Sequence, residues 1–123
     1  MADSSKVLPC CPPIAQGELS ASEAEQMSAT LKAVADPARL RLLSIIQAQP
    51  SGEACVCHLT EPLGLGQPTV SHHLRVLQEA GFLTSERRGK WVYYRVVPEA
   101  LAAVRSIFAP GGKQVRRAVA LSG

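Results

Sequence analysis

Residues 64–81 read GLGQPTVSHHLRVLQEAG, and this stretch decides the fold class. Gly64 and Gly66 end any helix that precedes them, and Pro68 stands where the first turn of a new helix accepts proline without losing a hydrogen bond. Beyond it, apolar residues recur at helical spacing and the opposite face carries no acid before Glu79. The apolar face is Val70, Leu74 and Leu77, and the polar face is Thr69, Ser71, His72, His73, Arg75 and Gln78. This pattern is typical of the second helix of a helix-turn-helix, although an ordinary amphipathic helix with a solvated face would share it.

Three helices are predicted ahead of this stretch. The first begins at Ser20 or Ser22, which suit an N-cap, and ends before Pro37. The second covers residues 37–49, is capped by Asp36, and is expected to pack through Leu40, Leu43 and Ile46. The third covers roughly residues 55–63 and would form the first half of the helix-turn-helix.

The segment after the helix-turn-helix predicts a two-stranded wing. Residues 83–87 run outward, Arg88-Gly89-Lys90 forms a basic turn, and a β-branched and aromatic run returns over residues 91–97. Pro98 then opens a last helix with Leu101, Val104 and Phe108 on one side. The expected fold is therefore mainly α with a small β-hairpin, a winged helix-turn-helix whose terminal helices are free to form a homodimer.

Length and charge agree with one small domain that binds a polyanion. A chain of 123 residues suits a single domain, and a domain this small often gains stability by pairing. Residues 71–123 hold 9 Lys/Arg against 3 Asp/Glu, whereas residues 1–70 hold 4 against 7. A basic half joined to a mildly acidic half suits a partner that presents phosphates to one face.

Residues 1–17 are expected to form a flexible arm that carries two adjacent cysteines, Cys10 and Cys11, between prolines. Residues 18–109 would form the winged domain and residues 110–123 a flexible tail. The N-terminus does not resemble a signal peptide and no stretch is long and apolar enough to span a membrane. We therefore expect a cytoplasmic protein whose cysteines are reduced.

Three motifs carry a resemblance to a known family. They are LKAVADPARLRLLSII at residues 31–46, EACVCHL at residues 53–59, and the run from residue 64 to residue 96. In this order and spacing they closely resemble the ArsR/SmtB family of metal-sensing repressors, from about Glu23 to Phe108. The resemblance implies a homodimer that binds an inverted-repeat operator in double-stranded DNA and represses a resistance operon until a metal releases it.

The resemblance also implies which residues meet the DNA. On the recognition helix these are Gln67, Thr69, Ser71, His72 and Arg75, and at the wing tip they are Arg88 and Lys90. Residue chemistry agrees, because Gln and Arg can contact base edges in pairs of hydrogen bonds and Lys and Arg neutralise the phosphate backbone.

Cys55 and Cys57 lie where arsenic and cadmium/lead sensors of this family place the metal-binding motif ELCVCDL. His58 replaces the acidic residue of that motif and Ala54 replaces its first leucine, but neither lost residue is a soft ligand. With Cys10 and Cys11, these cysteines form the expected thiolate set, and soft ligands select thiophilic ions. The vicinal arm pair resembles the N-terminal cysteine pair of arsenic sensors in this family, and this resemblance favours arsenite or antimonite as the inducer. Four cysteines in two pairs would also suit cadmium or lead.

Geometry sets a condition on this metal site. Residues i and i+2 of a regular helix point roughly 200° apart, so Cys55 and Cys57 converge only if Cys55 lies in an extended segment before the helix. The ion would then be shared between Cys55 and Cys57 of one subunit and Cys10 and Cys11 of the other. A thiol-redox sensor is the alternative mechanism. We expect no enzymatic activity, because the histidines that could pair with Cys57 lie on the presumed DNA face.

Overall fold

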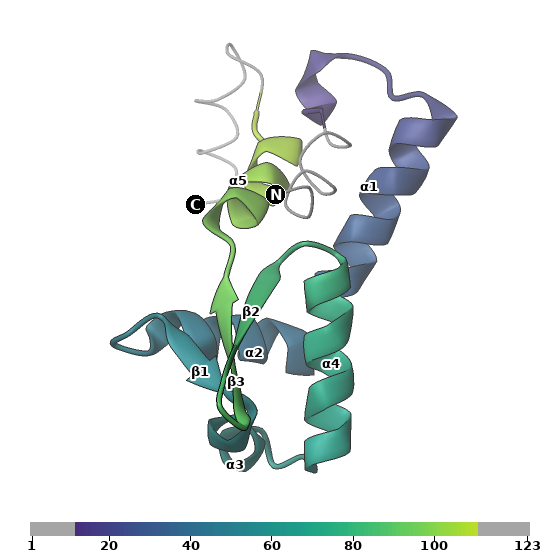
Figure 1. Cartoon of the computed structure of the whole chain (residues 1–123). Helices are drawn as coiled ribbons and strands as arrows, with labels where there is room; N and C mark the ends of the chain where they lie inside the picture. Colours follow the sequence, from purple (N-terminus) through teal and green to yellow (C-terminus); the bar gives the residue numbers. More distant parts are fainter. Residues whose placement is uncertain (1–11, 111–123) are drawn as a thin grey trace, which may run out of the picture.

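The computed structural model describes residues 12–110, and this part of the chain forms a winged helix-turn-helix (Figure 1). Cys10 and Cys11 lie outside the described residues. In chain order the elements are η3 (Ile14–Gln16), α1 (Ala21–Val34), α2 (Pro37–Ala48), β1 (Glu53–Cys55), η4 (Val56–His58), α3 (Thr60–Leu63), α4 (Gln67–Glu79), β2 (Leu83–Arg88), β3 (Trp91–Val96) and α5 (Pro98–Ile107).

The recognition helix is α4, and it forms as its periodicity predicts. Val70, Leu74 and Leu77 are completely buried, while Ser71, His72 and Arg75 between them are exposed. These three side chains enter one core with Leu42 of α2 and Phe82 at the base of the wing. Burial of one apolar face therefore decides which face of α4 is left for a partner.

The caps of the first two helices are also confirmed. Ser20 and Glu23 form a capping box, in which the Ser20 hydroxyl accepts from the Glu23 N–H at 3.0 Å and the Glu23 carboxylate accepts from the Ser20 N–H at 2.9 Å. Asp36 caps α2, with its carboxylate accepting from the Arg39 N–H at 3.1 Å. These local bonds satisfy donors that the first turn of a helix leaves free.

The prediction for the packing face of α2 is partly wrong. Leu43 and Ile46 are buried as expected, but Leu40 is 55% exposed and Leu42 takes its place in the core. The sequence of α2 is apolar over a wide arc, so spacing alone does not decide which side faces inward. Contact with α4 and β3 decides it.

The wing contains a strand that the sequence did not reveal. β2 and β3 form the expected hairpin, with Leu83 opposite Val96 and Arg88 opposite Trp91. β1 pairs antiparallel with the other edge of β3, so the sheet has three strands in the order β1-β3-β2 (Figure 1). Gly89 has φ +65° in the two-residue turn, a conformation that favours glycine.

The helix expected over residues 55–63 is also corrected. Cys55 has φ −96° and ψ 155° and ends β1, a 3-10 turn follows over η4, and the α-helical part is α3 alone. Ala54 and Cys55 are buried, and their backbone is held extended by pairing with Tyr94 and Tyr93 of β3. This strand pairing outweighs the helical spacing of the segment.

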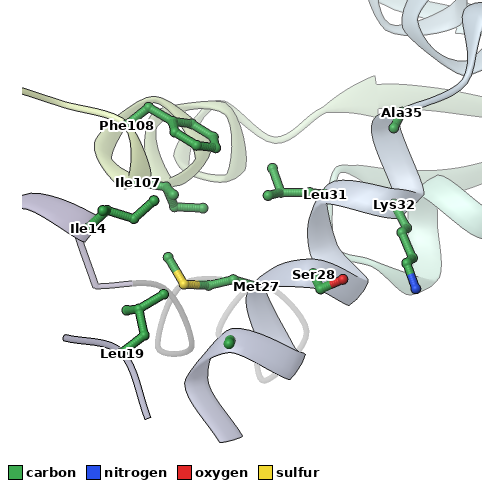
Figure 2. Close-up of a pocket in the computed structure, with 10 residues that line it drawn as sticks. Ile14, Leu19, Met27, Ser28, Leu31, Lys32, Ala35, Ile107 and Phe108 are labelled. Atoms are coloured by element: carbon green, nitrogen blue, oxygen red, sulfur yellow. The ribbon is translucent and has the colours of Figure 1, made fainter. Parts of the chain in front are cut away.

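Helices α1 and α5 meet at the end of the molecule opposite the wing tip (Figure 1). Met27 and Ile107 are buried against each other, whereas Leu101 of α5 and Phe108 at its C-cap are exposed. Beside them lies an apolar pocket of about 340 Å³, toward which Ile14, Leu19, Met27, Leu31 and Ile107 point (Figure 2). None of the helices over residues 12–110 combines the length and apolar character of a membrane span.

Leu74→Ala tests the packing on which α4 depends. Removing a fully buried leucine leaves a cavity, and we expect the free energy of unfolding to fall by about 2–5 kcal/mol. Urea denaturation followed by circular dichroism measures this loss. The control is Glu79→Ala on the exposed side of the same helix, for which we expect a change within about 0.5 kcal/mol. Equal losses in the two variants would contradict this account of the core.

Candidate nucleic-acid interface and metal centre

The exposed face of α4 borders a polar groove of about 430 Å³ between this helix and the wing. The groove contains Ser71, His72 and Arg75, three of the residues predicted to contact DNA. Its remaining lining is Pro68, Gln78 and Tyr94. Every polar α4 side chain in it is exposed, so hydrogen-bond donors of Arg75 and Gln78 are accessible to a ligand edge.

Gln67 and Thr69 lie outside this groove, in the exposed first turn of α4. Within the groove, the Arg75 guanidinium and His72 Nδ1 are 3.4 Å apart. Gln78 donates a hydrogen bond of 3.0 Å from Nε2 to the Ser85 hydroxyl and so connects α4 to β2. The helix and the wing therefore present their polar groups together.

The prediction that His73 lies on the exposed polar face of α4 is wrong. His73 is half-buried, and its Nδ1 lies 3.2 Å from Nη1 of Arg39 on α2. Arg39 Nε also donates to the Ala33 carbonyl at the end of α1, at 2.7 Å. The Arg39 N–H that caps onto Asp36 is the main cause of the lowered pKa of that carboxyl. This network fixes α4 against the first two helices.

The two wing-tip residues differ in their surroundings. Lys90 is exposed in the turn. Arg88 is already paired, with Glu53 of β1 at 2.6 Å and with Glu86 of β2 at 2.7 Å, and its guanidinium carbon is 4.5 Å from the centre of the Tyr93 ring. The hydrogen bonds from Arg88 are the main cause of the lowered pKa of Glu53, so this carboxylate is ionised at neutral pH.

The cysteine site lies in what we call the thiol loop, residues 55–58. Cys55 is buried at the end of β1 and Cys57 is exposed on η4. The Cys57 N–H donates to Cys55 Sγ at 3.4 Å, which caps the 3-10 turn. The two thiols can converge on one ion only if Cys55 lies in an extended segment, and the backbone of Cys55 is extended.

The ligand atoms of Cys55, Cys57 and His58 all lie within 4.8 Å of one another. Two thiolates on a tetrahedral ion with metal–sulfur bonds of about 2.3 Å stand roughly 3.8 Å apart, so a small movement closes the site. The pKa of Cys57 is raised, first by hydrogen bonding to the Cys55 thiol. A bound ion must therefore displace the proton of Cys57.

The structure brings together Cys55 and Cys57 and adds two residues beyond the four predicted cysteine ligands: His58, whose place beside Cys57 in the sequence already allows it to join a borderline metal, and Glu53. His58 contributes an imidazole to the thiol loop. Glu53 connects that loop to the wing tip. The sequence shows that Glu53 lies two residues before Cys55. Its partner Arg88 is 35 residues away, and no local sequence pattern predicts such a pair.

Comparison with known proteins now identifies the family. The model of the arsR family of bacterial regulatory proteins matches residues 36–85. The arsenical resistance operon repressor of Bacillus subtilis is 36% identical over 75 residues, a match that covers 61% of this chain and 70% of that protein. This chain belongs to the arsR family. Membership in a family of regulatory proteins confirms the prediction that the chain is not an enzyme.

Two further similarities place the chain within the arsR family. The arsenic resistance transcriptional regulator ArsR1 of Pseudomonas putida is 50% identical over 68 residues, which cover 55% of this chain and about half (52%) of that protein. A homodimeric winged helix-turn-helix domain from Mycobacterium bovis, a possible ArsR-family regulator, superposes with a TM-score of 0.54 at 27% identity, covering 86% of this chain and 84% of that one. The winged fold is thus confirmed.

Proposed function

We propose that this chain is a dimeric transcriptional repressor that binds operator DNA and is released by arsenite or antimonite bound to cysteine thiolates. The observation that carries the proposal is the convergence of Cys55 and Cys57 directly before the helix-turn-helix. Membership in the arsR family and the similarity to arsenic-resistance regulators support it. The inducing ion, the ligand set and the cytoplasmic location are parts of this proposal.

DNA recognition is assigned to the groove face of α4 and to the wing. Arg75 and Gln67 can make paired hydrogen bonds to base edges, while Thr69, Ser71 and His72 contact bases or phosphates. Lys90 neutralises phosphates at the wing tip. Arg88 adds positive charge there, but its ion pairs with Glu53 and Glu86 reduce this contribution. In a dimer, two such faces would read the two halves of an inverted repeat.

The thiol loop is placed to couple ion binding to DNA binding. η4 packs against both α3 and α4, the two helices of the helix-turn-helix. Cys55 Sγ would have to turn toward the ion to become a ligand, and this turn would alter the hydrogen bond from the Cys57 N–H that caps η4. Distortion of η4 then reaches α4 through direct contact. A coupling free energy of about 1–3 kcal/mol is enough for release.

A third thiolate would come from Cys10 or Cys11 of the partner subunit. Arsenite and antimonite favour three sulfur ligands, and within residues 12–110 the thiol loop supplies two. The two arm cysteines lie outside the described residues, so their part in the site rests on the sequence. Their binding would bring the arm onto the thiol loop.

His58 favours a second candidate inducer. An imidazole within reach of two thiols suits a divalent ion of borderline softness, such as cadmium or lead, better than it suits arsenite. A divalent ion would then bind Cys55, Cys57 and His58 from one thiol loop, with arm thiolates completing its coordination.

The dimer is assigned to the terminal helices. Leu101 of α5 is 38% exposed, and Phe108, the C-cap residue directly after α5, is 61% exposed. Phe108 borders the apolar pocket between α1 and α5 (Figure 2). Such surfaces mark interaction sites in small soluble domains. The M. bovis relative, which shares this fold, is homodimeric.

Two substitutions separate base reading from phosphate binding. Arg75→Ala should weaken operator binding by about 1–3 kcal/mol and relax sequence preference, whereas Lys90→Ala should weaken operator and scrambled DNA alike and lower the salt slope by about one. Fluorescence anisotropy over a range of salt concentrations measures both effects. Arg41→Ala removes an exposed cation of α2 that lines neither the groove beside α4 nor the apolar pocket, so it is the control and should bind as the wild type does. If Arg75→Ala binds operator normally, α4 is not the reading helix.

Cys55→Ser tests the thiolate site. The variant should bind operator DNA with wild-type affinity, because Cys55 does not line the groove, but arsenite should no longer release it. The same anisotropy assay with added arsenite measures this. A variant with Cys10→Ser and Cys11→Ser tests the arm separately and should also lose release by arsenite. Release that survives Cys55→Ser would show that the ion binds elsewhere.

Phe108→Glu tests the dimer surface. A charge in the middle of an apolar interface is costly to bury, so we expect the dimer to dissociate into monomers and operator affinity to fall. Sedimentation velocity of the reduced protein measures the oligomeric state. Leu40→Glu places the same charge on an exposed leucine of α2 that does not line this pocket, and it should leave the dimer intact. A dimeric Phe108→Glu variant would contradict this assignment.

A further inference from the structure

Glu53 is the most strongly bonded acidic residue in the described structure, and it lies two residues before a thiolate ligand. Its carboxylate accepts hydrogen bonds from Arg88 Nη1 at 2.6 Å, from Arg88 Nη2 at 2.9 Å and from Arg95 Nη2 at 3.1 Å. The Glu53 side chain is only 15% exposed, so solvent screens this pair less than it screens a surface ion pair. The bidentate geometry with Arg88 is the arrangement that is both strongest and most sensitive to orientation.

Arg88 in turn connects Glu53 to the wing. It stands opposite Trp91 beside the hairpin turn, and its guanidinium lies over the ring of Tyr93. Tyr93 is the strand partner of Cys55. The cysteine that would bind the ion and the arginine at the wing tip are therefore joined twice, through the Glu53 carboxylate and through Tyr93 of β3.

β1 is the element that would move. It is three residues long, lies at an edge of the sheet and pairs with β3 alone. Its last residue is the ligand Cys55 and its first is Glu53. If Cys55 turns toward an ion, so short a strand cannot hold Glu53 in place independently of Cys55.

We propose that Glu53 is a positioning residue that transmits occupancy of the cysteine site to the wing through its bidentate ion pair with Arg88. This inference rests on the proposed function, because it concerns the route by which the ion releases DNA. With the thiols free, Glu53 holds Arg88 and the hairpin in the orientation that fits DNA. Movement of β1 on ion binding breaks the bidentate alignment and frees the wing.

The test compares Glu53→Gln with Glu86→Gln in the full-length reduced protein. Both variants remove one carboxylate from the same arginine, but Glu86 is 67% exposed, belongs to β2, and its carboxylate forms its ion pair with Arg88 rather than with β1 or the thiol loop. The measured quantity is the ratio of operator affinities without and with saturating arsenite. Calorimetric titration of arsenite into free and DNA-bound protein gives the same ratio independently, because coupling between two sites is reciprocal.

For the wild type we expect a ratio of about 5–150. Glu53→Gln should lower it to below about 3, with the arsenite affinity of the free protein retained, whereas Glu86→Gln should keep the wild-type ratio. A residue that only stabilises the fold would change thermal stability but not this ratio. If Glu53→Gln does not fold, Arg88→Gln breaks the same pair from the wing, and the same loss of the ratio is expected.

Other outcomes would overturn the inference. If Glu53→Gln or Arg88→Gln keeps the wild-type ratio of operator affinities, the ion pair does not couple ion binding to DNA binding. An equal loss with Glu86→Gln would show that the charge around Arg88 matters rather than its connection to β1. A wild-type protein whose operator binding ignores arsenite would instead refute arsenite release in the proposed function.

Discussion

The short pairing between β1 and β3 is the interaction on which both functional regions depend. Glu53 pairs with Arg95 and Cys55 pairs with Tyr93, and this pairing holds Cys55 extended. Only an extended Cys55 allows its thiol to approach that of Cys57. The same pairing places the Glu53 carboxylate against Arg88 at the wing tip. Without it, residues 55–57 would follow helical geometry and the two thiols would point apart.

The buried face of α4 provides the second constraint. Val70, Leu74 and Leu77 fix the rotation of this helix, so its polar residues must face the groove shared with the wing. The thiol loop packs on the same helix. A disturbance at Cys55 therefore has two short routes to the surface proposed to face DNA, one through η4 to α4 and one through β1 to the wing. Both routes begin at elements of only three residues, η4 and β1.

The sequence predicted those parts of the fold that local patterns determine. The α4 periodicity, the Ser20 and Asp36 caps and the hairpin around Gly89 are each specified within a few residues, and each is found. β1 was missed because a strand of three residues is stabilised by a partner far along the chain, and the Glu53–Arg88 pair was missed for the same reason. Leu40 was misplaced because α2 is apolar over a wide arc. Of the candidate site, Cys55 and Cys57 were found from their spacing and family motif, whereas the approach of His58 to them depends on the 3-10 turn that follows β1.

We propose that soft ions bound by thiolates release this protein from DNA. The most direct measurement is a fluorescence-anisotropy titration of reduced protein on its own promoter DNA with arsenite, antimonite, cadmium, lead and zinc in parallel. This account predicts release by arsenite and antimonite at about one ion per subunit. Release by cadmium or lead alone would assign the site to a divalent ion, with His58 as a candidate ligand. The contradicting result is a complex that no ion dissociates but that peroxide does, because the thiols would then act as a redox switch rather than as ligands.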